Sequence, residues 1–286
     1  MMRATTSFLK RLLSSPIAAL GAILLVAFVV MALFAPQLAP FEPTAPDLRT
    51  RLAPPSWAGG PEQHVLGTDH LGRDILSRLI YGSRIALMVG LGGVTLQALL
   101  GITLGISAGY FGGWLDTGVS RLIDTLIAIP NTILYLTVLG VFGPSLIGLV
   151  LVIGFIGWTT FARVVRAETL SVRNREFVEA ARALGQYTPI VLLRHVLPAV
   201  MAPIIVVATL NVATVIILEA SLSFLGFGVQ PPTVTWGRML ADGRNYVATA
   251  WWLATFPGIF ITLLCLSLIF MGDRLRDVLD PRLRGR

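Results

Sequence analysis

The chain alternates between long apolar stretches and shorter segments that carry most of its charge. A helix needs about 20 mostly apolar residues to cross a bilayer, and six stretches meet this length. The pattern therefore predicts an all-α integral membrane protein with six transmembrane helices. These are Ile17 to Ala35, Ile85 to Tyr110, Leu122 to Leu139, Ser145 to Phe161, Met201 to Glu219 and Trp251 to Met271.

Two of these boundaries need an argument. No charged residue lies between Asp124 and Arg163, which is too long for one crossing, so we divide this run at Gly143 and Pro144, where proline cannot continue a helix. The first stretch follows a basic start and resembles a secretory signal. Its 19 uncharged residues from Ile17 to Ala35 exceed the roughly 7 to 15 of a signal's apolar region. We expect it to be retained as the first membrane helix.

The loop between the first two spans also contains a helical pattern, GRDILSRLIYGSR. Asp74 is a plausible N-cap and Gly82 can end the helix. A one-sided apolar face predicts a helix that lies flat on the outer membrane surface. That face comprises Ile75, Leu76, Leu79 and Ile80.

These elements divide the chain into consecutive parts. We expect an N-terminal tail over residues 1–16, a first transmembrane helix over 17–35, and an extracytoplasmic loop with the interfacial helix over 36–84. A five-helix core over 85–271 includes a cytoplasmic loop at about 163–198, and a tail follows over 272–286. With the N-terminus inside, 15 of the 22 basic residues lie in inner segments. The positive-inside bias then predicts that both termini and the 163–198 loop are cytoplasmic.

Composition and charge exclude several kinds of protein. The chain is 55% hydrophobic and 13% charged, against about 25% charged in an average soluble domain. Its net charge of +7 comes from short clusters beside the apolar spans, a pattern that indicates membrane orientation and not nucleic-acid binding. The lone Cys265 allows no intrachain disulfide, and the three histidines make no recognisable metal site.

Two kinds of active site are also absent from the pattern. The single lysine, Lys10, lies outside any Gly-Lys-Ser/Thr phosphate loop, so we expect no ATP or other cofactor to bind this chain through a P-loop. The stretch GISAG matches the GxSxG of a hydrolase, but a membrane helix does not supply the required strand-turn-helix. Gly101, Gly105 and Gly109 instead predict a close helix contact.

A few polar residues lie within the predicted spans. Glu219, at the outer end of the fifth span, could be the proton site of a secondary transporter or a hydrogen-bonded structural carboxylate, which we favour. Gln97, Asn131 and Asn211 could line a path for a polar solute or bond across helices, and the sequence does not choose between these. Asp124 is expected to reach the interface or to pair with Arg121.

The predicted 163–198 loop contains SVRNREFVEAARALGQYTPIVLLRHVLP. Asn174 can cap a helix that Gly185 ends, and a second short helix opens at Thr188 and runs to Pro198. The sequence predicts a helix-turn-helix elbow that docks into a partner groove. Its apolar stripe consists of Phe177, Ala180, Ala181 and Leu184.

EAARALG followed by HVLP resembles the EAA loop of ABC importer permeases. Three further stretches sharpen the match: LGTDHLGRDILSRLIYGSR, EASLSFLGFGVQPPTVTWGRML and GDRLRDVLDPRL. Together they resemble the C-type permease of the dipeptide, oligopeptide and nickel importers, from about residue 60 to the C-terminus.

This resemblance implies a type I ABC importer permease fold with a cytoplasmic coupling helix seated in a separate ATP-binding subunit. It implies a second permease subunit as heterodimer partner, two ATP-binding subunits that hold ATP and magnesium, and an extracytoplasmic solute-binding protein. The chain would lie in the bacterial plasma (inner) membrane. It would itself perform no covalent chemistry. A proton-driven carrier would not need the elbow. The coupling residues would be Phe177, Glu179, Ala180, Ala181, Leu184 and Gly185.

The GTDHLGRD stretch leaves two alternatives open. It contacts the solute-binding protein or the partner permease, or it only shapes a turn, with Thr68 and Asp69 as caps. The candidate contact residues are Gly67, Thr68, Asp69, Gly72, Arg73 and Asp74.

Overall fold

The structure is a computed structural model that describes residues 15–279. Lys10 and the last residues of GDRLRDVLDPRL lie outside the described part of the chain. Within that part, helices form the fold and no β-strand is present apart from an isolated bridge between Thr68 and Asp74. The protein is therefore all-α, as the apolar pattern predicts.

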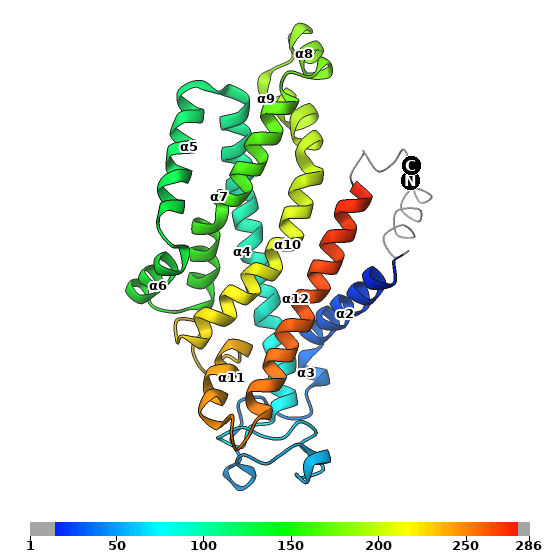
Figure 1. Ribbon diagram of the computed structural model, residues 1–286, viewed down its shortest axis with the longest axis vertical. Coiled ribbons are helices and arrows are strands. Elements are labelled where there is room, and N and C mark those ends of the chain that lie inside the picture. The colour runs from blue at the N-terminus through cyan, green and yellow to red at the C-terminus, as the bar shows by residue number, and fades with distance from the viewer. Residues whose placement is uncertain (1–14, 280–286) are drawn as a thin grey trace.

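Most of the long helices run roughly along one common direction, and the connecting segments lie at the two ends (Figure 1). Five helices are long and apolar enough to cross a membrane. A sixth span results if two helices that meet at a bend, Gly113–Ala128 and Asn131–Phe142, count as one. The elements are α2 (Pro16–Leu33), α3 (Ala35–Leu38), η1 (Leu48–Thr50), η2 (Ser56–Ala58), α4 (Ile75–Phe111), α5 (Gly113–Ala128), α6 (Asn131–Phe142), α7 (Leu146–Val172), α8 (Glu176–Ala183), α9 (Thr188–Val191), η3 (Leu192–Val196), α10 (Leu197–Phe224), α11 (Trp236–Gly243), η4 (Arg244–Tyr246) and α12 (Trp252–Leu279).

The prediction of a separate interfacial helix in the loop before the second span is wrong. The residues from Ile75 onward form the first turns of α4, which continues without a break to Phe111. Asp74 is the N-cap as expected, because its carboxylate accepts a hydrogen bond from the Ser77 N–H at 2.7 Å. Gly82 does not end the helix. A Cβ there would lie 2.5 Å from the Trp236 ring, and the Trp236 indole donates to the Leu79 carbonyl at 2.9 Å.

The observed boundaries of other spans also differ from the predicted ones. The third span breaks at Pro130, where α5 and α6 meet at 85°, because proline cannot donate the next helical hydrogen bond. The division at Gly143 is confirmed, since this residue has a φ of +81° and ends α6. Residues 272–279, expected as tail, continue α12.

The second helix of the elbow does not stop at Pro198. The chain is helical from Thr188 to Phe224, so α9, η3 and α10 form one rod. The turn η3 directly before Pro198 is π-helical, and its shifted hydrogen bonding accommodates the proline's missing N–H. The fifth span is thus continuous with the elbow.

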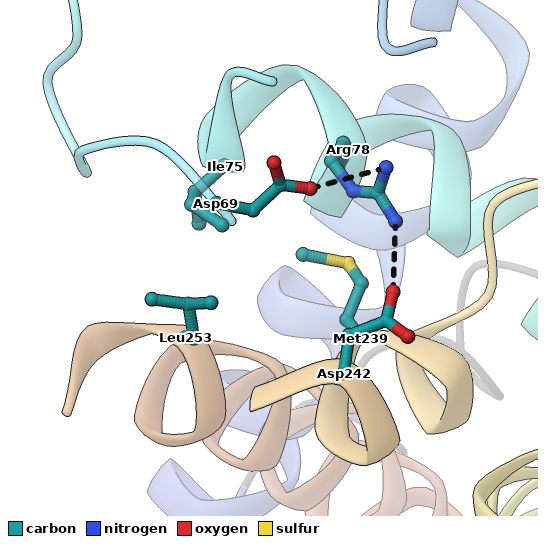
Figure 2. Close-up of a pocket in the computed structure, with 6 residues that line it drawn as sticks. All are labelled: Asp69, Ile75, Arg78, Met239, Asp242 and Leu253. Carbon is teal, nitrogen blue, oxygen red and sulfur yellow. Dashed lines mark ion pairs between the residues drawn. The ribbon is translucent and has the colours of Figure 1, made fainter. Parts of the chain in front are cut away.

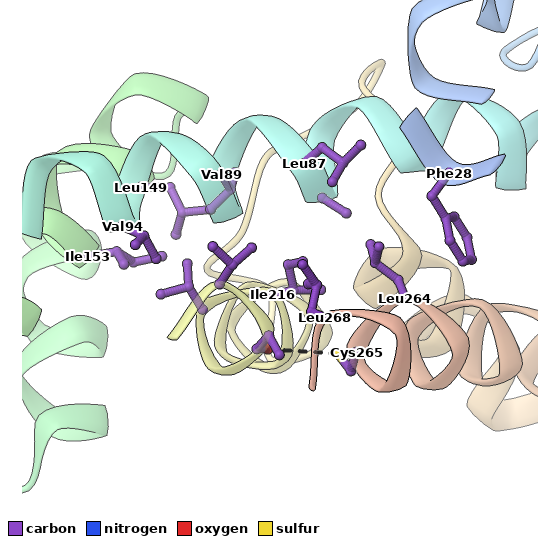
Figure 3. Packing of buried hydrophobic residues seen from close by; sticks show 14 of the residues in the cluster. Phe28, Leu87, Val89, Val94, Leu149, Ile153, Ile216, Leu264, Cys265 and Leu268 are labelled. Carbon is purple, nitrogen blue, oxygen red and sulfur yellow. Dashed lines mark hydrogen bonds between the residues drawn. The ribbon is translucent and has the colours of Figure 1, made fainter. Parts of the chain in front are cut away.

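Helix α4 lies at the centre of the core. Figure 3 shows side chains from α2, α4, α7, α10 and α12 meeting around it, among them Phe28, Val89, Ile153, Ile216 and Leu264. These residues are nearly or fully buried. A core of this kind holds the helices together by close packing, since lipid tails are as apolar as the side chains.

The three glycines of α4 make the predicted close helix contact, and the partner helix is α7. A Cβ at Gly101 would lie 2.4 Å from the Phe161 Cβ, and one at Gly105 would lie 2.8 Å from the Ala162 carbonyl oxygen. A Cβ at Gly109 would lie 2.7 Å from the Thr169 Cβ. Any side chain at these positions would separate the two helices.

Polar side chains also bridge the helices. Gln97 on α4 donates to the Ile153 carbonyl on α7 at 3.0 Å, and Asn211 on α10 donates to the Gln97 side chain. Gln97 and Asn211 therefore bond across helices. Asp124 pairs with Arg163 on α7 at 3.3 Å and not with Arg121.

We predict that Gly105→Val destabilises the protein by about 1 to 3 kcal/mol, the usual cost of overpacking. Gly118→Val on α5 is the matched control, because a Cβ at Gly118 meets no atom within 4 Å. Thermal unfolding of the two purified variants, followed by fluorescence size-exclusion chromatography, measures the difference. Equal unfolding temperatures would contradict the close contact of α4 with α7.

Candidate functional site

The elbow of α8 and α9 lies at one end of the molecule, beyond the end of α7 (Figure 1). Helix α8 begins at Glu176, and Arg175, not the expected Asn174, occupies the N-cap position. Glu176 and Glu179 lie in the first turn, where negative charge stabilises a helix through its dipole.

Gly185 ends α8 as predicted. Its φ is +73°, a region that favours glycine. The Gly185 N–H donates to the Arg182 carbonyl at 2.9 Å and the Gln186 N–H donates to the Ala181 carbonyl at 3.1 Å. This pair of bonds is a Schellman motif, and it sets the direction in which the chain enters α9.

One face of α8 packs on the permease body. Val178 is fully buried and Ala181 is 4% exposed. The Arg182 guanidinium lies 4.6 Å from the centre of the Tyr110 ring, and its Nε donates to the Tyr110 hydroxyl at 3.0 Å. Arg173, just before α8, donates to the Gly109 carbonyl at 2.9 Å. These contacts attach the elbow to the C-terminal end of α4.

The other face of the elbow is open. Phe177, Leu184 and Tyr187 are 42%, 80% and 71% exposed, and Glu179 and Ala180 are exposed as well. Glu179 has no ion pair or side-chain hydrogen bond with any residue that the structure describes. Exposed apolar patches of this kind mark interaction surfaces. We call Phe177, Glu179, Ala180, Leu184 and Tyr187 the elbow surface.

The structure therefore divides the predicted coupling residues. Five of the six, all except Ala181, lie on the exposed side of the elbow. Ala181 faces the body together with Val178, which the sequence analysis did not single out. The i, i+3 spacing of Val178 and Ala181 is the signal that identifies the inward face.

The GTDHLGRD stretch lies at the opposite end of the molecule and is largely buried. The Thr68 hydroxyl accepts from the Ala53 N–H at 2.9 Å and donates to the Thr50 carbonyl. The Trp252 indole donates to the Thr68 carbonyl at 3.1 Å. Asp69 accepts from the Leu71 N–H at 2.8 Å, so it closes a local turn as a cap.

Asp74, Gly67 and Gly72 of this stretch are also held within the subunit. The Asp74 carboxylate contacts His64 Nδ1 at 3.0 Å in addition to capping α4. Gly67 and Gly72 have φ values of +80° and +77°. A Cβ at Gly72 would lie 1.7 Å from the Asp47 carbonyl oxygen. Each glycine is needed for a close approach of the backbone.

These contacts favour one of the two alternatives for GTDHLGRD. Thr68, Asp69 and Asp74 are at most 3% exposed, and Gly67 and Gly72 are buried. Buried groups are not available to a partner protein, so a direct contact of this stretch would involve its other side chains, Leu71 and the partly buried His70 and Arg73, and it stays a prediction. The turn-shaping role, with Thr68 and Asp69 as caps, agrees with these hydrogen bonds. Arg73 is partly buried in an ion pair with Asp69 at 2.6 Å.

A buried charge cluster continues from this stretch into α11. Figure 2 shows Arg78 of α4 between Asp69 and Asp242, at 3.4 and 3.9 Å. Arg73 also lies 3.6 Å from Asp242. The sequence analysis missed Arg78 and Asp242, because their pairing depends on a contact between segments far apart in the chain. An arginine among the apolar residues of ILSRLI was the one available signal.

Glu219 is 2% exposed within the bundle and accepts a hydrogen bond from Ser223 Oγ at 2.6 Å. This partner lies one turn further along α10. The arrangement is that of a structural carboxylate, which was the favoured expectation. Within the described residues, no group of three or more histidine, cysteine, aspartate or glutamate side chains could hold a metal ion.

Known proteins with similar sequences are membrane subunits of importers. Residues 101–285 match the family of binding-protein-dependent transport system inner membrane components, and residues 5–55 match the N-terminal membrane domain of oligopeptide transport permease C. The di/tripeptide permease DppC of Pseudomonas aeruginosa is 43% identical, with 93% of this chain and 89% of that protein covered. The dipeptide permease DppC of Escherichia coli is 41% identical, with 93% and 89% covered.

A solved structure agrees at the level of the fold. One chain of the MetNI methionine ABC transporter, in an inward-facing conformation, aligns with a TM-score of 0.58 at 18% identity. The alignment covers 71% of this chain and 97% of that chain. The long helices of the present chain thus adopt an ABC importer permease fold. By its sequence over most of its length and by this fold, the chain belongs to the family of binding-protein-dependent transport system inner membrane components.

Proposed function

We propose that this chain is one of two permease subunits of a peptide importer, and that an ATPase subunit binds its elbow surface. The observation that carries the proposal is the combination of an anchored inner face and an open apolar outer face on α8. As a permease of this family, the chain is a non-enzymatic membrane subunit that works with an ATPase and a substrate-binding protein. A heterodimeric partner permease and two ATPase subunits complete the proposed assembly.

Di- and oligopeptides are the proposed substrates. The relatives that resemble this chain over most of its length are described as dipeptide, di/tripeptide or peptide permeases. Nickel, the other substrate that the sequence motifs suggested, is not named among these relatives. We therefore assign peptides to this importer.

The proposed orientation places the elbow in the cytoplasm and the GTDHLGRD stretch outside the cell. The positive-inside count supports it, since the basic residues concentrate around α8 and the chain ends. The described end of α12 lies in the same half of the molecule as α8 (Figure 1). With an ATPase bound to the elbow, both would be on the cytoplasmic side.

The mechanism is alternating access driven by the elbow. Closure of the ATPase subunits would move α8, which is joined to the fifth span through the continuous rod from Thr188 to Phe224. Arg182 and Tyr110 join the same helix to α4. A displacement of α8 would therefore rock these helices as rigid elements between outward-open and inward-open states.

We predict that Glu179→Ala and Gly185→Val weaken assembly with the ATPase or uncouple ATP hydrolysis from uptake. Glu179 can form a charge-assisted bond, with a loss of about 1.5 to 3 kcal/mol if that bond is buried. A side chain at Gly185 costs about 1 kcal/mol or more at its left-handed φ and tilts the elbow. ATPase pull-down and peptide uptake, at matched membrane levels of permease, measure the effect.

Two control variants separate coupling from stability. Gly143→Val introduces a side chain at a φ of +81° with no atom within 4 Å of its Cβ, as at Gly185. Glu62→Ala removes an exposed glutamate at the opposite end of the molecule. Normal assembly and uptake in both elbow variants, or equal defects in the controls, would refute the role of the elbow surface.

The orientation has its own prediction. In a Cys265→Ala background, Ala58→Cys should react with an impermeant thiol reagent in cells with a permeable outer membrane. Ala183→Cys should react only after the inner membrane is permeabilised. Both alanines are exposed and lie at opposite ends of the molecule. The reverse labelling pattern would invert the proposed topology.

A further inference from the structure

We propose that a cleft at the outer end of the molecule binds the C-terminal residue of a peptide, with its free carboxylate on Arg244. The inference rests on the proposed function, since it names a contact of the transported peptide. The cleft lies between the end of α10, α11 and η4 and has a volume of about 440 Å³, within the range of small-molecule sites. We call it the outer cleft.

The outer cleft carries an excess of positive charge. Asp242 at its wall pairs with Arg238 at 3.1 Å and also lies within 4 Å of Arg73 and Arg78. The latter two share Asp69 as well. With Arg244, four arginines of this region face two aspartates. An incoming anion would balance the excess.

Arg244 has the largest free hydrogen-bonding capacity among these arginines. It is exposed and forms no ion pair with the described residues, and its guanidinium carbon lies 6.0 Å from the centre of the Phe224 ring. Arg238 donates through Nε to Asp242, and its terminal N–H groups donate to no residue in the described part of the chain. A guanidinium fork can hold a carboxylate through two parallel hydrogen bonds. The exposed Asn245 adds a neutral amide beside it.

One wall of the outer cleft carries apolar side chains next to these donors. Phe224 and Leu225 close the end of α10, and Leu225 is 52% exposed. Tyr246 stacks on His70 with ring centres 6.0 Å apart, which extends this wall. A site for a bare inorganic anion has no need of such a surface. A carboxylate joined to an apolar side chain, as in the last residue of a peptide, fits donors and apolar side chains that lie side by side.

The location agrees with a role in transport. The outer cleft lies beside α11, at the opposite end of the molecule from α8 (Figure 1). In the proposed orientation this is the side on which a binding protein delivers its peptide. The outer cleft would hold the peptide's carboxyl end as the binding protein releases it.

Photo-crosslinking of the membrane complex tests the inference. We would use the permease pair with its ATPases in lipid nanodiscs, without the binding protein, so that the binding protein's selectivity does not enter. The probe is an Ala-photoleucine dipeptide with a free carboxylate, compared with its C-terminal amide. We expect the acid to label residues of the outer cleft, with Leu225 and Tyr246 as the expected sites, and the amide to label them at least about tenfold less.

The variants test the named arginine. Arg244→Gln should reduce labelling by the acid about tenfold or more, while Arg244→Lys should retain a large part of it because the charge remains. Arg49→Gln is the matched control, since Arg49 is also an exposed arginine of the outer end without an ion pair in the described chain. It should leave labelling unchanged.

Three results would overturn the inference: labelling outside the outer cleft, equal labelling by acid and amide, or equal labelling of wild type and Arg244→Gln. Weaker binding of the solute-binding protein to Arg244→Gln, with peptide labelling unchanged, would show a contact with that protein instead. ATP-dependent peptide uptake by the wild-type importer with its binding protein is measured in parallel. Uptake without labelling would refute this site alone, whereas the absence of uptake would refute the proposed function.

Discussion

The close contact of α4 with α7 is the interaction on which the rest of the structure depends. In a bilayer, helices gain little from burying apolar surface against each other, so their association relies on close packing. Gly101, Gly105 and Gly109 allow this by bringing the α4 backbone against α7. The three positions lie in the last part of α4, at the end that carries the elbow. The packing thus fixes the position from which α8 is attached.

Helix α4 connects the two ends of the molecule. At one end, Tyr110 and the Gly109 carbonyl receive Arg182 and Arg173 from the elbow. At the other end, Arg78 enters the charge cluster with Asp242, and Gly82 admits the ring of Trp236. Both of these partners belong to α11. A single helix therefore contacts the elbow and the element that borders the outer cleft, which suits a subunit that transmits motion across a membrane.

The sequence predicts features that depend on local chemistry. Apolar length reveals the spans, although the bend at Pro130 and the exact ends escape it. The Asp74 cap and the left-handed Gly185 follow from rules that involve only neighbouring residues. Gly82 shows where such rules fail: glycine can end a helix or make room for a ring, and the choice depends on Trp236, more than 150 residues further along the chain.

The same reasoning applies to GTDHLGRD. A polar, glycine-containing loop has the composition of a binding surface, and its internal partners cannot be seen in the sequence. Asp69 is occupied by Arg73, Arg78 and two backbone N–H groups, and Thr68 is held by Trp252 from a remote helix. Long-range pairing of this kind removes polar groups from the surface without leaving a pattern along the chain.

Two motifs that resemble the same family thus have opposite physical characters. In GTDHLGRD the side chains of Thr68, Asp69 and Asp74 are buried and bonded within the subunit, which is the character of a scaffold. On the elbow surface, Glu179 is exposed and unpaired within the described chain, beside the exposed rings of Phe177 and Tyr187. A folded subunit gains nothing for its own stability from such groups, because exposed apolar side chains and unpaired charges contribute little. The proposed ATPase would cover these groups at a rigidly held position, and the proposed peptide carboxylate would do the same for Arg244 at the outer cleft.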